Sequence, residues 1–127
     1  MIILMKIEYN TIDPFQKDFK KLLKKYRTLK EDLGTAKRDA IELYHIKHID
    51  NQSVVLVEGF CTEKIQICKI KKFACKALKG RGSRSGIRII YAFYCHCCKV
   101  DFIEMYFKGR KENENRGRIK KYLKDFS

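Results

Sequence analysis

Two long apolar runs, joined by only a few residues, constrain the fold of this chain more than any other feature. Ile87–Tyr94 reads IRIIYAFY and Val100–Phe107 reads VDFIEMYF. Both runs are rich in Ile, Val, Tyr and Phe, which suit the pleated and half-buried surface of a sheet. The connection Cys95–Lys99 has a length that is common in β-hairpins. The two runs are therefore predicted to pair as antiparallel strands.

The N-terminal third predicts one strand and two helices. Met1–Ile12 is mostly apolar and β-branched, which favours a strand. Asp13 at the N-cap and Pro14 at the first helical position mark a helix start. Thr28 with Glu31 fits a capping box, which begins a second helix. Because few residues join the two helices, they should form a hairpin that covers the sheet. The first helix carries an apolar stripe at helical spacing: Phe15, Phe19, Leu22, Leu23 and Tyr26.

The remaining segments complete the predicted domain. His45–Gln52 is polar and predicts a loop, whereas Ser53–Glu58 and Ile65–Ile70 predict two further strands. Lys72–Ser85 is basic and rich in glycine, which indicates a mobile loop or a wide hairpin arm. A last helix, capped by Asn113 or Asn115, has its own apolar stripe: Ile119, Tyr122, Leu123 and Phe126.

This order of elements predicts a single α+β domain over residues 1–127. An N-terminal strand and a helical hairpin pack on a small, mainly antiparallel sheet, and a short helix ends the chain.

Positive charge dominates the composition. The chain has 29 Lys and Arg against 15 Asp and Glu, a formal charge of +14, which favours polyanionic partners. Nucleic acid is the first candidate and an acidic protein the second. Met1–Met5 is too short for a signal peptide, and no run approaches the length of a membrane span, so we expect a cytoplasmic protein without a membrane partner. The six cysteines are then expected to be reduced thiols.

Cations converge at one end of the predicted hairpin. Antiparallel pairing places the start of Ile87–Tyr94 beside the end of Val100–Phe107, so Arg88 should lie near Tyr106 and Lys108. Lys69 and Lys71 are two residues apart and should share one face of the preceding strand. We predict a concave patch that binds RNA phosphate and carries out catalysis, formed by Lys69, Lys71, Arg88, Tyr106, Lys108 and Arg110. Cations in and beside the glycine-rich loop are candidate RNA-backbone contacts: Lys72, Lys76, Lys79, Arg81 and Arg84.

RNA cleavage by a 2′-hydroxyl needs a proton acceptor, cations around the phosphorus and a proton donor for the leaving oxygen. An arginine can clamp a phosphate through two hydrogen bonds, and a crowded lysine can act as the base. Tyr106, Glu104 and His96 are candidates for the proton transfers. Since cations supply the charge stabilisation, no metal ion or other cofactor is expected. The alternative is that these cations only solvate an exposed sheet face.

A Cys-His-Cys-Cys sequence at 95–98 invites a zinc interpretation. Its spacing does not match a paired tetrahedral framework, and Cys61, Cys68 and Cys75 add no familiar ligand pattern. The cysteines are better explained as buried thiols or as thiols without a specific role, and no metal site is predicted.

Three segments resemble the RelE/ParE superfamily of bacterial toxins, including its HigB-like members: CKIKK at 68–72, SGIRIIYAFY at 85–94 and FIEMYFKGRKENENRGRIKKYL at 102–123. The resemblance extends over the whole chain, and SGIRIIY and YFKGRKENE are its specific part. It implies a type II toxin–antitoxin toxin that acts as a ribosome-dependent mRNA endoribonuclease, or mRNA interferase, and inhibits translation. The implied partners are a cognate antitoxin and mRNA on the ribosome, with contacts to 16S and 23S rRNA.

By position, Lys69 and Lys71 resemble the strand lysines that act near the scissile phosphate in this family. Arg88 resembles the arginine that stabilises the transition state, and Lys108 or Arg110 the basic residue after the last strand. The C-terminal tyrosine of some RelE proteins has no clear match, because Arg116 and Ile119 occupy that neighbourhood. Tyr106 and Glu104 are therefore stand-ins for the proton-transfer group.

Two other functions stay open at this point. A ParE-like toxin has the same fold and inhibits DNA gyrase without being a nuclease, and fold alone does not separate the two. A basic RNA-binding module would bind RNA in a salt-sensitive way without cutting it.

Overall fold

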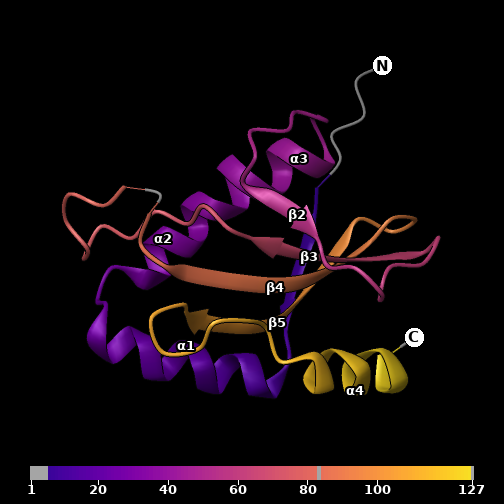
Figure 1. Cartoon of the computed structure of the whole chain (residues 1–127). Coiled ribbons are helices and arrows are strands. Elements are labelled where there is room, and N and C mark those ends of the chain that lie inside the picture. The colour runs from indigo at the N-terminus through magenta and orange to yellow at the C-terminus, as the bar shows by residue number, and fades with distance from the viewer. Residues whose placement is uncertain (1–5, 83, 127) are drawn as a thin grey trace.

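A five-stranded sheet in the order β1-β5-β4-β3-β2 forms the centre of the computed structural model, which describes residues 6–82 and 84–126 (Figure 1). β1 runs parallel to β5, and the other neighbouring pairs are antiparallel. The prediction of a mainly antiparallel α+β fold is therefore confirmed. The strands are β1 (Glu8–Thr11), β2 (Val54–Leu56), β3 (Ile65–Ile70), β4 (Ile87–Tyr94) and β5 (Lys99–Phe107).

Strand positions agree with the sequence pattern where apolar residues are dense. β3 and β4 have the predicted bounds, and β5 begins one residue before Val100. β2 occupies only the middle of the predicted Ser53–Glu58 segment. The predicted first strand is shortened to Glu8–Thr11, and its Met1–Met5 part lies outside the described residues. Lys6 and Ile7 are not in a strand, because β1 pairs with β5 only from Glu8 onward.

The helical hairpin consists of α1 (Asp13–Lys25) and a second helical segment, divided into α2 (Leu29–Ala36), a π-helical stretch at Lys37–Glu42, and α3 (Leu43–His45). Sequence pattern did not predict the π-helical stretch. Ile12, rather than Asp13, is the N-cap of α1. Asp13 therefore lies in the first turn, where its negative charge interacts favourably with the positive end of the helix dipole.

The predicted capping box at Thr28 is wrong, although α2 does begin directly after it. The Thr28 hydroxyl makes no cap hydrogen bond and instead donates to Asp32 at 2.7 Å. The same oxygen accepts the backbone N–H of Ala77 at 2.9 Å. Thr28 therefore fastens the β3–β4 loop to α2 instead of closing the helix end.

Helices cover both faces of the sheet. The helical hairpin buries Phe15, Leu29 and Ile41 against Tyr91 and Phe102 on one face. On the other face, α4 (Arg116–Phe126) covers a second core, in which Ile119 and Tyr122 join Ile67, Ile90 and Ile103.

The start of α4 agrees with prediction, whereas its end does not. Asn115 caps the helix, since its side-chain oxygen accepts the Arg118 N–H at 3.0 Å. The predicted apolar stripe is buried at Ile119 and Tyr122, whereas Phe126, its last residue, is 57% exposed. It lies one turn beyond Tyr122 and stacks on that ring at the end of the helix.

The long β3–β4 loop projects from one end of the sheet, and the turn at 95–98 lies at the opposite end (Figure 1). β3 ends, β4 begins and β5 ends at the same side as the long loop. Residues that flank these strand ends are therefore brought together there.

Candidate functional site

A cavity of about 620 Å³ lies at this end of the sheet. Five cations line it: Lys71, Lys72, Arg84, Arg88 and Lys108. They come from the end of β3, the base of the long loop, β4 and the residue after β5. Because like charges repel in a shared concave space, the cavity is suited to a polyanion such as a phosphodiester backbone.

Gly86 permits the close approach of β4 and β5 at this cavity. Its φ is +83°, and a Cβ there would lie 2.9 Å from the Phe107 ring. The Lys108 N–H donates to the Gly86 carbonyl at 2.7 Å, which holds the residue after β5 beside the start of β4. Arg88 pairs in register with Tyr106. The predicted convergence of Arg88 with Lys108 is confirmed.

The loop before β2 adds Asp50 and Gln52 to the cavity wall. The Lys71 N–H donates to the Ser53 carbonyl at 2.8 Å, which ties this loop to the end of β3. One Asp50 oxygen accepts the Gln52 N–H at 2.8 Å. Asp50 is the single carboxylate among the described residues that line the cavity. Sequence reasoning missed it, because nothing in the polar 45–52 segment signals that it reaches the strand ends.

Lys69 lies outside the cavity, although the prediction grouped it with Lys71. Its ammonium group pairs with Glu114 at 3.0 Å, and both side chains are mostly buried. Burial raises the pKa of Glu114 and is the largest single effect, but the hydrogen bond from Lys69, a backbone N–H and the charges of Lys69 and Arg116 together outweigh it and hold that pKa below its usual value. Lys71 follows the end of β3, lies outside the strand and lines the cavity, so the two lysines have different environments.

Tyr106 shares a sheet face with Arg88 but has little solvent exposure. Burial, reinforced by the Glu114 and Glu104 carboxylates, raises the pKa of Tyr106 to about 12, and Arg88 opposes this shift. The hydroxyl is therefore protonated near neutral pH. It can donate a proton but cannot accept one in that state.

Glu104 is buried and fully engaged by the β5–α4 connection. One carboxylate oxygen accepts from the Lys111 ammonium group and the other from the Asn115 N–H at 2.8 Å. These contacts orient the start of α4. The Glu104 carboxylate is therefore not accessible to a substrate for the predicted proton transfer.

Arg110 lines a different cavity, of about 260 Å³, between α1 and the end of β5. One turn residue, Gly109, separates it from Lys108, and its N–H donates to the Phe107 carbonyl at 3.0 Å. Asp18 and Lys25 from α1 share this second cavity. The structure therefore separates Arg110 from the five-cation cavity.

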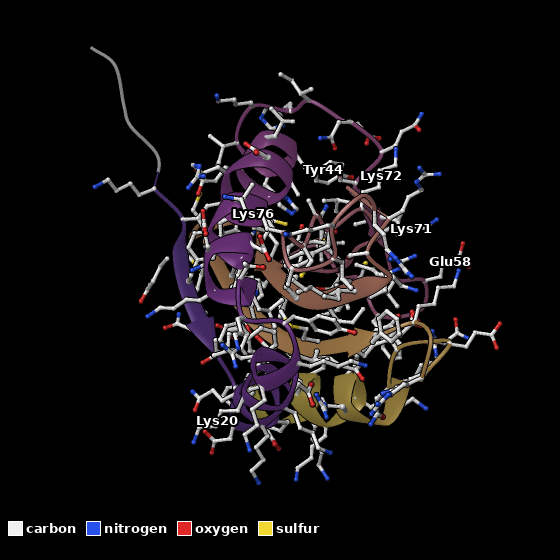
Figure 2. The ribbon with its side chains drawn as sticks, turned by 90° about the vertical axis from the view of Figure 1, so that its left-hand side faces the viewer. Lys20, Tyr44, Glu58, Lys71, Lys72 and Lys76 are labelled. Carbon is white, nitrogen blue, oxygen red and sulfur yellow. The ribbon has the colours of Figure 1, made fainter. Side chains whose placement is uncertain are left out.

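The predicted RNA-contacting cations of the long loop divide into two groups. Lys72 and Arg84 line the five-cation cavity, whereas Lys79 and Arg81 are exposed and Lys76 pairs with Glu31 on α2 at 2.5 Å. Figure 2 shows Lys76 beside the α2 ribbon and Lys71 with Lys72 away from it. The loop is also more fixed than predicted at its start, because Phe73 and Cys75 are buried and Asp32 accepts the Lys76 N–H at 3.2 Å.

No ligand set for a metal ion emerges near the cysteines. All six cysteines are free thiols, and within residues 6–82 and 84–126 no group of three or more His, Cys, Asp or Glu side chains gathers in a metal-binding arrangement. Cys68 is buried below His45, and burial raises the pKa of its thiol to about 12.

One solved structure, an archaeal RelE–RelB complex from Pyrococcus horikoshii OT3, shares this arrangement of elements. The similarity has a TM-score of 0.51 and covers 84% of this chain and 99% of the matched chain. The chain has a RelE-like fold. Sequence identity over the RelE-like match is 15%, so the likeness concerns the fold.

Sequence comparisons add nothing to the RelE-like match, since no protein-family model and no curated protein matches the chain. Among the described residues of this RelE-like fold, no helix has the length and apolar character needed to cross a bilayer.

Proposed function

We propose that this protein is a RelE-like toxin of a type II toxin–antitoxin system, which cleaves mRNA on the ribosome. The observation that carries the proposal is the five-cation cavity at the strand ends of a RelE-like fold. A cavity of about 620 Å³ with five cations and one carboxylate favours a phosphodiester over a neutral metabolite. It also favours RNA cleavage over the alternative of an exposed, merely solvated sheet face.

The proposed reaction is intramolecular attack within the RNA. The 2′-oxygen loses its proton and bonds to the adjacent phosphorus, and the bond from phosphorus to the 5′-oxygen of the next nucleotide breaks. That 5′-oxygen takes up a proton, which leaves a 2′,3′-cyclic phosphate and a 5′-hydroxyl. Negative charge builds on the non-bridging oxygens during the attack, and fixed cations stabilise it.

Individual residues divide this work in the proposal. Arg88 binds the non-bridging oxygens in the transition state, because it is the half-buried cation of the set and a guanidinium offers paired donors. Lys71 and Lys108 hold the flanking phosphates. Asp50 accepts the 2′-hydroxyl proton, because it is the carboxylate that faces the cavity.

The proposed partner is an antitoxin protein. The matched RelE chain comes from a complex with RelB. A chain of charge +14 with a similar fold has the electrostatic character to bind an acidic inhibitor.

Primer extension on a reporter mRNA, after brief induction of the protein in bacterial cells, tests the proposal. Wild type, Arg88→Ala and Lys124→Ala would be compared, since Lys124 is an exposed cation on α4 outside the cavity. Cuts confined to translated codons, lost with Arg88→Ala and kept with Lys124→Ala, are the expected result. Circular dichroism of the purified Arg88→Ala protein checks that the fold persists.

Other outcomes would point elsewhere. Growth arrest with intact mRNA and an induced DNA-damage response would indicate that the protein inhibits DNA gyrase and is not a nuclease. Salt-sensitive RNA binding without cuts or arrest would leave an RNA-binding module. Cleavage by Arg88→Ala at the wild-type level would contradict the assignment of the five-cation cavity as the active site.

A further inference from the structure

The β4–β5 turn carries a cysteine at its first position and another at its last. The turn consists of residues 95–98 and closes at the Tyr94–Lys99 pair, so Cys95 begins it and Cys98 ends it. Paired residues on antiparallel strands have Cα atoms about 4.5–5.5 Å apart, and a disulfide joins Cα atoms about 4.4–6.8 Å apart. Cys-x-x-Cys is also the spacing of many thiol–disulfide exchange sites. The turn therefore holds Cys95 and Cys98 near the separation that a disulfide requires.

Backbone hydrogen bonds fix both ends of this turn. The Cys95 N–H donates to the Lys64 carbonyl at 2.9 Å, and the Cys98 carbonyl accepts the Glu8 N–H at 3.0 Å. Cys98 has a φ of +47°, a left-handed conformation that reverses the chain before β5. Contacts from neighbouring segments thus set the two backbone positions in the reduced protein. Closure of a disulfide ring then requires rotation of two side chains and leaves the path of the turn in place.

Cys95 and Cys98 also line the same cavity, of about 510 Å³, beside α3. Cys97 is exposed and lies between them in sequence, but it does not belong to the described residues that line this cavity. Cys95 is exposed and Cys98 is half-buried, so a small oxidant can reach the pair from solvent. The exposed His48 imidazole lines the cavity as well and can accept a thiol proton. The cavity therefore brings together the first and last thiols of the turn.

The cysteines outside this turn differ from the pair in access or in contacts. Cys68 and Cys75 are buried, and burial raises the pKa of both thiols. Since the thiolate is the form that reacts with a disulfide, both should react slowly. The Cys61 thiol donates to the Val57 and Ile67 carbonyls, each at 3.7 Å. Oxidation is therefore expected first at Cys95 and Cys98.

We propose that Cys95 and Cys98 form a reversible dithiol–disulfide site whose substrates are low-molecular-weight disulfides. The Cys95 thiolate attacks one sulfur of the small disulfide, whose S–S bond breaks, and a small thiol leaves with a proton. The Cys98 thiolate then attacks the Cys95 sulfur and releases the second small thiol, which also takes up a proton. The protein loses two electrons and two protons, and the small disulfide gains them.

This reaction uses no residue of the proposed nuclease site. Neither cysteine lines the five-cation cavity, and the turn lies at the opposite end of the sheet from the long β3–β4 loop (Figure 1). The inference therefore does not depend on RNA cleavage.

Titration of the folded, full-length protein with oxidised glutathione tests this site. Oxygen is excluded, and reduced glutathione is kept at a fixed concentration. Samples are quenched in acid, their free thiols are alkylated, and mass spectrometry is applied to the intact protein and to the tryptic peptide of residues 89–99, which contains all three cysteines of the turn. Wild type should lose two hydrogen atoms, with Cys97 as the alkylated thiol of that peptide. Circular dichroism of the oxidised sample checks that the fold persists.

Cys97→Ser is the matched control for Cys98→Ser, because the two changes remove neighbouring thiols from one turn. Cys97→Ser should form the disulfide at the same concentration of oxidised glutathione as wild type. Cys98→Ser cannot close the ring and should accumulate a mixed disulfide between Cys95 and glutathione. Because ring closure is intramolecular, the wild-type midpoint should lie at an oxidised-glutathione concentration about tenfold or more below that of Cys98→Ser.

The location of the disulfide in wild type is decisive by itself, so the test does not require that each variant fold. Wild type that carries glutathione and forms no internal disulfide would overturn the proposal. A disulfide that includes Cys97 or Cys61, or loss of the disulfide in Cys97→Ser, would overturn it as well. None of these results would alter the expectation for Arg88.

Discussion

The backbone N–H of Lys108 donates a 2.7 Å hydrogen bond to the carbonyl oxygen of Gly86. This contact joins the residue after the last strand to the residue before β4, and both line the five-cation cavity. It is possible because Gly86 has a positive φ and no side chain to meet the Phe107 ring. The position of Lys108 relative to Arg88 therefore depends on a glycine that carries no charge.

Gly86→Ala should lower the free energy of unfolding by about 2–4 kcal/mol, because it combines a strained φ with a clash against Phe107. Gly80→Ala is the matched control. Gly80 also has a positive φ, of +80°, but has open space around its Cβ position, so about 1–2 kcal/mol is expected there. Urea unfolding measures both. Equal losses in the two variants would show that Phe107 does not restrict this site.

Asp50→Asn should reduce the rate of RNA cleavage by roughly 10²–10⁴-fold, since the amide cannot accept the 2′-hydroxyl proton. RNA binding should be kept or slightly strengthened, because one negative charge leaves the cavity. Single-turnover cleavage and filter binding separate the two effects. Asp125→Asn, on α4, removes the same charge far from the cavity and should cleave at the wild-type rate. A wild-type rate for Asp50→Asn would assign the proton to another group.

Glu114→Gln should lower the free energy of unfolding by roughly 1–3 kcal/mol, because it leaves the largely buried Lys69 ammonium group without its carboxylate. The pKa of Glu114 is lower in the folded protein than in the unfolded chain. Its stabilisation is therefore fully present above the unfolded pKa, near 4.5, and is lost as pH falls through the folded pKa. Urea unfolding of wild type and Glu114→Gln over this range measures the difference.

The Lys69→Met variant and the double variant complete a thermodynamic cycle for the Lys69–Glu114 pair. An interaction energy near zero would mean that the ion pair does not stabilise the protein. A gap between wild type and Glu114→Gln that does not narrow in acid would contradict the pH dependence.

His45 predicts a second loss of stability at mildly acidic pH. Burial, reinforced by His48, lowers the pKa of His45 from 6.5 to about 4. Between these two values the unfolded chain binds a proton that the folded protein does not. The free energy of unfolding therefore decreases as the pH is lowered, by roughly 3 kcal/mol at most. His45→Gln keeps a polar group for Tyr91 but does not titrate. Its unfolding free energy should depend less on pH over this interval, and an unchanged slope would exclude His45.

Periodicity and strand propensity were enough to predict most of the scaffold. The apolar density of Ile65–Ile70 and Ile87–Tyr94 fixed both strands to their observed bounds. Antiparallel pairing then predicted that Arg88 and Lys108 converge, because register is a local consequence of a short turn. The π-helical stretch had no such signal, since its residues satisfy the pattern of an ordinary helix.

Side-chain partners were much harder to predict. Lys69 and Lys71 differ by two positions in sequence, yet one meets Glu114 from the β5–α4 connection and the other lines the cavity. Asp50 reaches the same cavity through a loop whose path is set by a backbone contact with the end of β3. These outcomes depend on tertiary contacts over long sequence separations, which composition and spacing do not encode.

The register between β4 and β5 shifts once: Ile90 pairs with Glu104 but Tyr91 pairs with Phe102. Ile103 is the extra residue, and the strand changes parity there. Even-numbered residues before it, such as Phe102, face the helical hairpin, whereas even-numbered residues after it, such as Tyr106, share the face of Arg88. Without this extra residue β5 would alternate regularly, with the pairs Ile90–Glu104 and Tyr91–Phe102 directly following each other. The bulge therefore places two consecutive residues, Ile103 and Glu104, on the face of the sheet that α4 covers, and so adds one side chain to the core beneath that helix.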